Sequence, residues 1–182
     1  MKKLMTVLLL SVAALGLCTS AFAASNDAKA AYKTAQDSAD SEYKLARAKC
    51  DALAGNAKDV CVEEAKLART RIKAEATANY ENTPKAHTKA MIDIADAEYA
   101  VAKEKCDDKA GNDKDVCIKE AKAIKETSVA NAKAGKKVTD ARHEAAETKN
   151  EANYKVAIEK CEGLAGPTKE ACVASAKVQY GK

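Results

Sequence analysis

A unit of two cysteines recurs three times along this 182-residue chain and constrains its fold more than any other feature. Ten residues separate the cysteines of each unit, and a glycine stands five places after the first. The unit recurs after 56 residues, from Cys50 to Cys106, and again after 55, from Cys106 to Cys161. A tyrosine stands seven residues before each first cysteine, at Tyr43, Tyr99 and Tyr154. Such a period predicts a fold of repeated supersecondary units.

Each unit predicts a helical hairpin. Its glycine marks a helix end, because glycine adopts the left-handed conformation without steric cost. Asn56 and Asn112 follow the first two glycines and predict N-caps, each with an acidic residue three positions later. Pro167 follows the third glycine and suits the first turn of a helix. The two cysteines of a unit lie equally far from this turn, so they face each other on antiparallel helices.

This symmetry predicts a disulfide within each hairpin. A disulfide needs Cα atoms about 5.5–6 Å apart, closer than packed helices usually allow, so small residues must flank it. Alanine occupies both facing positions one turn from each bridge, in the pairs Ala46–Ala65, Ala102–Ala121 and Ala157–Ala176. Zinc and redox sites typically need closer cysteine pairs, and no two cysteines of these units are closer than eleven positions. The predicted bridges are Cys50–Cys61, Cys106–Cys117 and Cys161–Cys172.

Further turn signals divide the chain into six predicted helices. Asn82-Thr83-Pro84 predicts one break, and Gly135 to Thr139 predicts a second. The predicted fold class is all-α: three consecutive antiparallel helical hairpins, each closed by a disulfide near its tip, at 24–82, 83–137 and 138–182. The six helices are expected at about 26–54, 57–81, 84–110, 113–134, 139–165 and 167–180.

The N-terminus reads as an export signal. Two lysines precede the apolar run Leu4–Leu17, and Ala21-Phe22-Ala23 is an A-x-A cleavage site, so residues 1–23 are predicted to be a cleavable signal peptide. Lipoprotein processing at Cys18 is the alternative, but Leu17 stands where a small residue is expected. Cleavage leaves six cysteines, an even number that favours disulfides. The predicted location is therefore the periplasm or the exterior, with no membrane span after cleavage.

Composition and motifs point away from several function classes. Loss of two lysines with the signal lowers the formal charge from +4 to +2, and aromatic residues make up 4%, which argues against a nucleic-acid partner. His87 and His143 are the only histidines and read as solvated surface residues. Acidic residues between 107 and 115 suggest a weak cation site, although helix-start electrostatics explain most of them. We expect no catalytic residue, no metal ligand and no cofactor.

The cysteine unit also resembles a known group of sequences. The copies AKCDALAGNAKDVCVEEAK, EKCDDKAGNDKDVCIKEAK and EKCEGLAGPTKEACVASAK are similar to those of small exported bacterial proteins of unknown function. These proteins are often labelled cell-envelope biogenesis or TolA-like. The resemblance covers essentially the whole chain and implies a role in the cell envelope. True TolA keeps an N-terminal membrane anchor, whereas the signal here is expected to be cleaved.

Three hypotheses of function follow. The first is a non-enzymatic periplasmic scaffold, spacer or interaction protein of the envelope, with an envelope protein or cell-wall component as its unknown partner. The second is a periplasmic chaperone or ligand-binding helical protein, for which an apolar groove would be the sign. The third is a cation- or copper-handling protein, which would need inward-facing acids or thiols. The sequence leaves the oligomeric state open.

Overall fold

The computed structural model of the chain describes residues 20–182, and all of its regular structure is helical over this range. Most of the predicted signal peptide, residues 1–23, lies outside the described residues. The helices follow one another through short turns, and a single turn of 3₁₀ helix, η1, closes the first of them. The elements are α1 (Ser20–Lys49), η1 (Cys50–Ala52), α2 (Gly55–Glu81), α3 (Pro84–Cys106), α4 (Gly111–Glu162) and α5 (Gly166–Tyr180).

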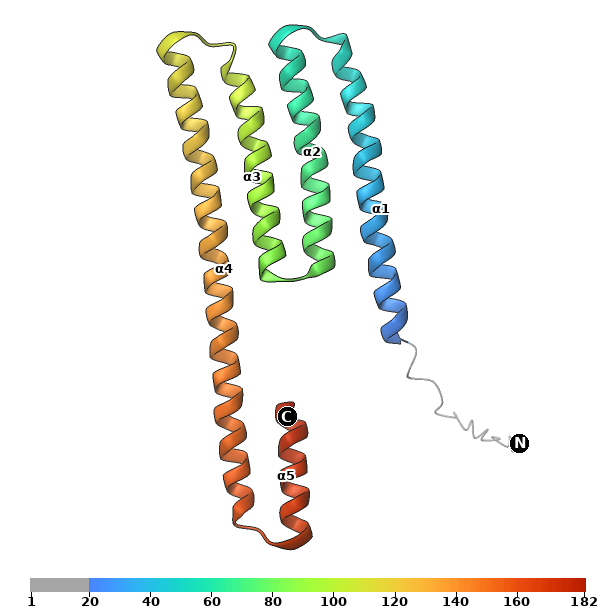
Figure 1. The fold of residues 1–182 in the computed structure, drawn as a ribbon, viewed down its shortest axis with the longest axis vertical. Coiled ribbons are helices and arrows are strands. Elements are labelled where there is room, and N and C mark those ends of the chain that lie inside the picture. Colours follow the sequence, from blue (N-terminus) through green and yellow to red (C-terminus); the bar gives the residue numbers. More distant parts are fainter. Residues whose placement is uncertain (1–19) are drawn as a thin grey trace, which may run out of the picture.

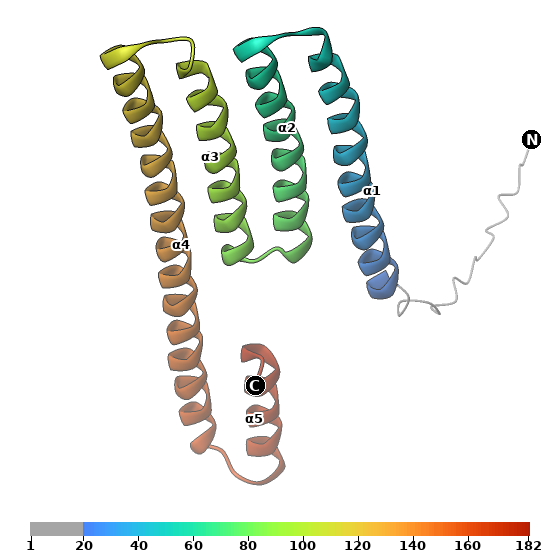
Figure 2. The ribbon, with the colours of Figure 1, turned by 45° about the horizontal axis from the view of Figure 1, so that its top comes forward.

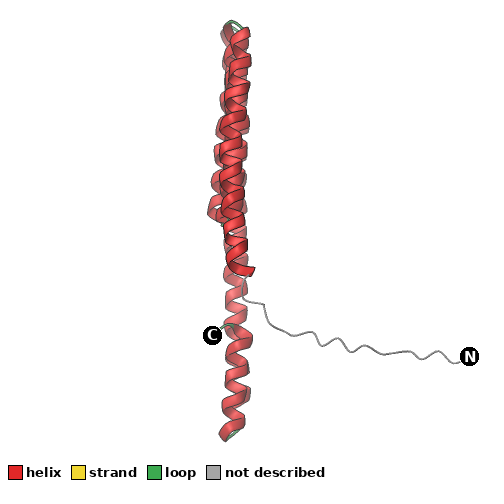
Figure 3. Ribbon diagram, turned by 90° about the vertical axis from the view of Figure 1, so that its right-hand side faces the viewer, coloured by secondary structure: helices red, strands yellow, loops and turns green. Residues whose placement is uncertain are grey.

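The helices form a layer one helix thick. Helices α1, α2, α3 and the first half of α4 lie side by side, alternating in direction, as Figures 1 and 2 show. Viewed from the edge in Figure 3, these helices fall within a single thickness. Helix α4 continues well past this layer, and α5 folds back along its far half, on the same side as α3 (Figure 1). Most helices therefore have neighbours at their sides and open faces above and below.

The core of this layer is made of alanine and cysteine. A helix in a single layer buries only the narrow stripes that touch its neighbours, and small residues there let the helix axes approach closely. Large apolar side chains stay exposed, as at Leu45 (68%), Ile124 (68%) and Val178 (84%). The buried hydrophobic residues of the described chain are Ala39, Cys50, Ala65, Ala74, Ala78, Ala86, Ala90, Ala95, Val101, Cys106, Ala121, Ala132, Cys161 and Ala176.

The turn between α2 and α3 follows the predicted chemistry. Asn82 ends α2 in the left-handed region at φ 44°. The Thr83 hydroxyl then accepts a hydrogen bond from the amide of Ala86 at 3.1 Å, and Pro84 occupies the first turn of α3. Proline suits this position because its missing N–H has no helical partner there. The sequence therefore located this reversal of the chain correctly.

The predicted break between 134 and 139 is wrong. Helix α4 runs without interruption through Gly135, and Thr139 donates a hydrogen bond to the Gly135 carbonyl at 3.1 Å within the helix. An isolated glycine costs a helix only about 1 kcal/mol relative to alanine, and this segment has no proline to clash with the preceding turn. The surrounding alanine, lysine and glutamate residues favour the helix. The second and third hairpins therefore share one 52-residue helix instead of following each other as separate units.

The predicted asparagine caps at the hairpin tips are also wrong. Gly55 and Gly111 adopt positive φ of 56° and 55°, as expected of a turn glycine, but each is the first residue of its helix. The N-cap positions belong to Ala54 and Ala110, which are extended and make no side-chain cap. The asparagine after each glycine thus lies inside the first turn. The preceding helices also end earlier than predicted, at Lys49 and Cys106, because the tip needs several residues to cross between helices.

Candidate functional site

The three cysteine units form the three predicted disulfides. Their Cα–Cα distances are 5.6, 5.7 and 5.8 Å, so the three tips have nearly the same geometry. Each first cysteine is at most 1% exposed, whereas its partner on the second helix is half-buried. The bonded pairs are Cys50–Cys61, Cys106–Cys117 and Cys161–Cys172. Bridges of this kind are typical of an oxidising compartment.

Small residues stand beside the bridges, as the sequence predicted. The alanine that follows each second cysteine by four residues is buried, at Ala65, Ala121 and Ala176. The alanine that precedes each first cysteine by four residues is half-buried. In the first and third hairpins the cysteine sulfur also lies within 3.4 Å of the carbonyl oxygen of that alanine. Small, closely packed residues therefore surround each disulfide.

A group that the sequence reading missed lies further from each tip: an acid, a cation and the repeated tyrosine. In the first hairpin the Arg69 guanidinium lies 4.2 Å from the centre of the Tyr43 ring and 3.9 Å from the carboxylate of Asp40. In the second, the Lys125 ammonium lies 5.3 Å from the Tyr99 ring centre. We call this arrangement the clasp. The face of the repeated tyrosine's ring attracts the cation.

The clasp recurs with the repeat. Lys125 also lies 2.8 Å from the carboxylate of Asp96, which corresponds to Asp40 in the first hairpin. In the third hairpin, Lys182 lies 2.5 Å from Glu151 and 5.8 Å from the Tyr154 ring centre. An acid three residues before each repeated tyrosine was the signal in the sequence that could have found the clasp. The cation was harder to find, because the third hairpin takes it from the C-terminal residue.

A second ion pair joins the two sides of each tip. The acid next to the first cysteine pairs with a lysine on the second helix of the hairpin, at 3.0, 2.8 and 2.6 Å in the three copies. The three pairs are Asp51–Lys58, Asp107–Lys114 and Glu162–Lys169. These pairs use acids that could otherwise have attracted a cation. Within the described residues, no cluster of three or more His, Cys, Asp or Glu residues is arranged to hold a metal ion.

The ion pairs shift the acidity of their members. A hydrogen bond from Lys73 holds the pKa of Asp40 below its usual value, and hydrogen bonds from Arg47 and Lys58 do the same for Asp51. Likewise, the hydrogen bond from Lys182 lowers the pKa of Glu151. All three acids are solvent-accessible, so these shifts reflect surface pairing and stabilise the fold modestly.

The two histidines do not come together. His87 is exposed at the start of α3, and His143 is exposed in the middle of α4, where it lies 3.5 Å from Glu147 on the same helix. Neither contacts a disulfide or a clasp in any interaction of the described residues. Their positions agree with the surface role that the sequence predicted.

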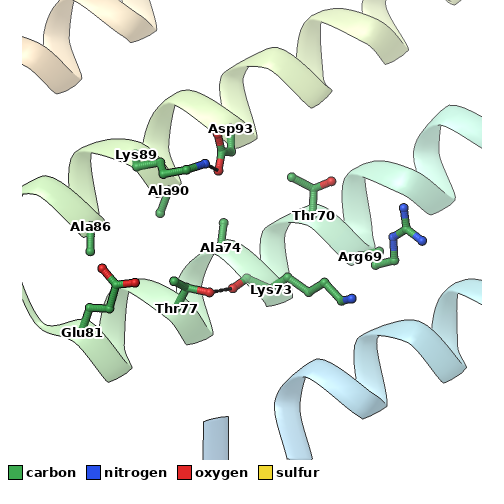
Figure 4. A pocket seen from close by; sticks show the side chains of 10 residues that line it. All are labelled: Arg69, Thr70, Lys73, Ala74, Thr77, Glu81, Ala86, Lys89, Ala90 and Asp93. Carbon is green, nitrogen blue, oxygen red and sulfur yellow. Dashed lines mark hydrogen bonds and ion pairs between the residues drawn. The ribbon is translucent and has the colours of Figure 1, made fainter. Parts of the chain in front are cut away.

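Two of the open grooves of the molecule lie between neighbouring helices of the layer. The first, of about 480 Å³, lies between α2 and α3 and is shown in Figure 4. Its floor is formed by alanines such as Ala74 and Ala90, and charged side chains line its sides: Arg69, Lys73, Glu81, Lys89 and Asp93. We call this the charged groove. The second, of about 440 Å³, lies where the α2–α3 turn meets α4 and includes Pro84, Met91 and Ala132.

Comparison with known proteins does not assign the chain to a family. No protein-family model, curated protein or solved structure that was compared with the chain matches it. Among the helices of residues 20–182, none combines the length and the apolar character that crossing a membrane requires.

Proposed function

We propose that this protein is a non-enzymatic helical scaffold or interaction protein of the bacterial cell envelope, exported to the periplasm or secreted by a cleavable signal peptide. Three intramolecular disulfides support an oxidising location. The resemblance of the cysteine units to exported envelope proteins supports the compartment. The partner is an envelope protein or a cell-wall component.

The observation that carries this proposal is the layer itself. A layer one helix thick presents two broad faces to solvent (Figure 3). Ion pairs between neighbouring helices, such as Arg71–Glu98, Lys105–Glu64 and Lys125–Asp96, lie at its surface. The disulfide, the tip ion pair and the clasp recur in all three hairpins. Each of them holds two helices against each other. Each of them thus serves to keep an extended charged surface in shape. Such a surface suits partner recognition, in which charge complementarity provides specificity.

The charged groove is the most suitable part of this surface for a partner. It places three cations, Arg69, Lys73 and Lys89, around a floor of small side chains that admits a close approach. Lys73 and Arg69 contact Asp40, and Lys89 contacts Asp93, so the basic groups are held in position rather than freely mobile. An acidic segment of a partner could exchange with these carboxylates.

A ligand-binding or chaperone role is the second candidate. It is favoured by the groove at the α2–α3 turn, where Met91 is 55% exposed beside Pro84 and Ala132. Methionine at an exposed surface adapts to varied apolar partners. The scaffold role is preferred because polar side chains, such as Asn131 and Lys136, also line this groove.

The test is crosslinking in intact cells that export the protein. One variant replaces the cations of the charged groove, Arg69→Gln, Lys73→Gln and Lys89→Gln. Its matched control removes the same charge from exposed lysines that form no ion pair in the described chain, Lys33→Gln, Lys49→Gln and Lys103→Gln. We expect the groove variant to lose crosslinked partners while the control keeps them, with unchanged helical circular dichroism in both.

A third variant separates binding from chemistry. His87→Ala combined with His143→Ala is expected to leave crosslinking and any cellular phenotype unchanged. If this variant alone abolished the phenotype while the groove variant did nothing, a discrete chemical site would be the better account. Binding of a hydrophobic fluorophore that Met91→Lys abolishes, without any crosslinked partner, would favour the second candidate.

A further inference from the structure

The internal repeat relates α4 to both α2 and α3. A shift of 56 residues carries Cys61 of α2 onto Cys117 near the start of α4. A shift of 55 carries Cys106 of α3 onto Cys161 near the end of α4. The first half of α4 therefore corresponds to α2, and the second half corresponds to α3. In the earlier repeat these two helices pack against each other, but in α4 they are joined end to end.

Four alanines of the contact between α2 and α3 are retained in α4, whereas Ile94, which packs against them, corresponds to Lys149. Ala74 and Ala78 of α2 correspond to Ala130 and Ala134, and Ala86 and Ala90 of α3 correspond to Ala141 and Ala145. Those in α2 and α3 are buried, whereas all four in α4 are exposed. Further along the same face, Val101 of α3 is 6% exposed, whereas its counterpart Val156 in α4 is 53% exposed. Helix α4 thus carries both halves of a helix-packing surface, and neither half has a partner within residues 20–182.

These residues share one face of α4. Their spacings alternate between four and seven residues, an 11-residue period that matches about 3.67 residues per turn and drifts little around the helix. We call this face the α4 stripe, and it consists of Ala123, Ala130, Ala134, Ala141, Ala145, Ala152 and Val156. Ala134 lies two residues, or about 200° of helical turn, from the buried Ala132. The stripe therefore lies on the side of α4 away from α3 and α5, where Figure 1 shows no other helix.

We propose that the α4 stripe is a self-association surface, on which a second copy of this chain packs its own α4 in the antiparallel direction about a two-fold axis. The register follows from the repeat. In the α2–α3 pair, Ala90 packs in one cluster with both Ala74 and Ala78, so facing residue numbers total between 164 and 168. Shifting the two helices by 56 and 55 residues changes this range to between 275 and 279. Ala134 then lies beside the second copy's Ala141 and Ala145, and Ala130 lies beside its Ala145.

An ion pair of the α2–α3 contact is also retained in α4. In that contact, Lys105 of α3 lies 2.7 Å from Glu64 of α2. The repeat places Lys160 and Glu120 at the corresponding positions. These two residues are 40 positions apart on one straight helix, about 60 Å, so they cannot meet within one copy. Antiparallel association brings Lys160 of one copy to Glu120 of the other, at both ends of the interface.

Charge is also complementary around the two-fold axis. Lys133 and Lys137 come just before the centre of the stripe, and Asp140 and Glu144 come just after it. In an antiparallel pair, the lysines of one copy lie beside the acids of the other on the same flank of the interface. Lys133, Lys137 and Glu144 are in no ion pair of the described single chain, whose pairs in this region are Lys136–Asp140 and His143–Glu147.

The alternative is that the two halves of the α4 stripe pack against each other within one chain. The contacts proposed for two copies would also form if α4 broke near Gly135 and its second half folded back, as between α2 and α3. In the straight helix, Ala134 and Ala141 are seven residues and about 10 Å apart, too far for a disulfide, whose Cα atoms lie within about 7 Å. The double variant Ala134→Cys with Ala141→Cys therefore distinguishes the two arrangements.

We expect mild oxidation of this double variant to give a covalent dimer on a non-reducing gel, and the control Thr139→Cys with Ala146→Cys, on the other faces of α4, to stay monomeric. A monomer in which peptide mapping finds the Ala134→Cys and Ala141→Cys sulfurs joined within one chain would overturn the proposal in favour of the folded-back chain. Absence of either bridge would overturn it as well.

Sedimentation velocity over a hundredfold range of concentration provides the second readout. The unmodified protein is expected to shift from monomer to dimer. Ala134→Glu with Ala141→Glu places four carboxylates around the axis and is expected to weaken association at least tenfold. Thr139→Glu with Ala146→Glu adds the same charge elsewhere on α4 and should leave it unchanged. A protein that stays monomeric throughout, or equal effects of the two variants, would contradict the proposal.

Discussion

The seam between α2 and α3 and the middle of α4 carry the same spacing of alanines but have opposite surroundings. Between α2 and α3 the alanines are buried, and both helices have neighbours on either side. Every residue from 137 to 150 of α4 is exposed. The spacing of small residues therefore shows which face of a helix can pack against another helix. Whether a second helix packs there depends on the residues that connect the two helical segments.

The connecting residues account for the difference. Asn82-Thr83-Pro84 stops one helix and starts another, because proline cannot continue the helix and threonine caps the next one. Gly135 only weakens the helix. Across the exposed segment, helix propensity and pairs one turn apart, such as Lys136–Asp140, stabilise the helix without tertiary packing.

The largest expected effect is the loss of stability of α5 when its disulfide is removed, compared with that of α3. Helix α5 packs only against α4 in the described structure, so Cys161→Ser with Cys172→Ser removes its main constraint (Figure 1). We predict a loss of about 3 kcal/mol in the free energy of unfolding, with fast amide exchange throughout α5. Hydrogen exchange by mass spectrometry checks this.

The matched control is Cys106→Ser with Cys117→Ser, which breaks the equivalent bridge within the layer. A similar loss of global stability is expected there, but α3 should keep slow exchange because α2 still packs against it. Equal protection of α5 and α3 in the two variants would show that α5 is held by something other than its tip.

The next effect tests the alanine seam. Ala78 is 2% exposed between α2 and α3, so Ala78→Leu should destabilise the protein by about 1–3 kcal/mol through overpacking. Ala146→Leu, on an exposed part of α4, should change stability by less than about 0.5 kcal/mol. Urea unfolding followed by circular dichroism measures both. A neutral Ala78→Leu would mean that α2 and α3 are not closely packed.

Replacing Gly111 and replacing Gly135 by alanine should change the stability of the protein in opposite directions. Gly111 has φ of 55°, where a Cβ atom is strained, so Gly111→Ala should cost about 1–2 kcal/mol. Gly135 is helical and an added Cβ would meet no atom within 4 Å, so Gly135→Ala should stabilise the protein by about 1 kcal/mol. Thermal melting is the readout. Destabilisation by Gly135→Ala would indicate that α4 bends there.

The smallest effect concerns pH. The lowered pKa values of Asp40, Asp51 and Glu151 mean that their ion pairs stabilise the protein above the ordinary values of 3.8 and 4.5. This stability is lost as pH falls through the lower values of the folded state. The melting temperature should therefore be level between pH 7 and 5 and decline below. Asp40→Asn with Asp51→Asn should flatten the decline, and an unchanged profile would show that the pairs contribute nothing.

The local rules read from the sequence identified the disulfides well. Cys50 and Cys61 could be paired because both lie at fixed distances from a turn glycine. Helix geometry then determines which residues of the two helices face each other. The clasp was missed because Lys182 reaches its tyrosine from outside the repeated position that Arg69 and Lys125 share, so the cation does not recur at one position in all three copies. The break at Gly135 was predicted wrongly because a weak helix breaker competes with strong helix formers on both sides, and the outcome depends on their sum.

The continuity of α4 is the central feature of this structure, and a distance measurement tests it most directly. Spin labels at Lys122→Cys and Lys155→Cys, both on exposed positions of α4, are 33 residues apart. Pulsed electron resonance on labelled protein diluted into an excess of unlabelled protein reports only distances within one chain. A continuous helix predicts a separation of about 50 Å, from a rise of 1.5 Å per residue. A separation near the 8–10 Å spacing of packed helices, allowing for the label arms, would mean that α4 folds back at Gly135 and would contradict the account.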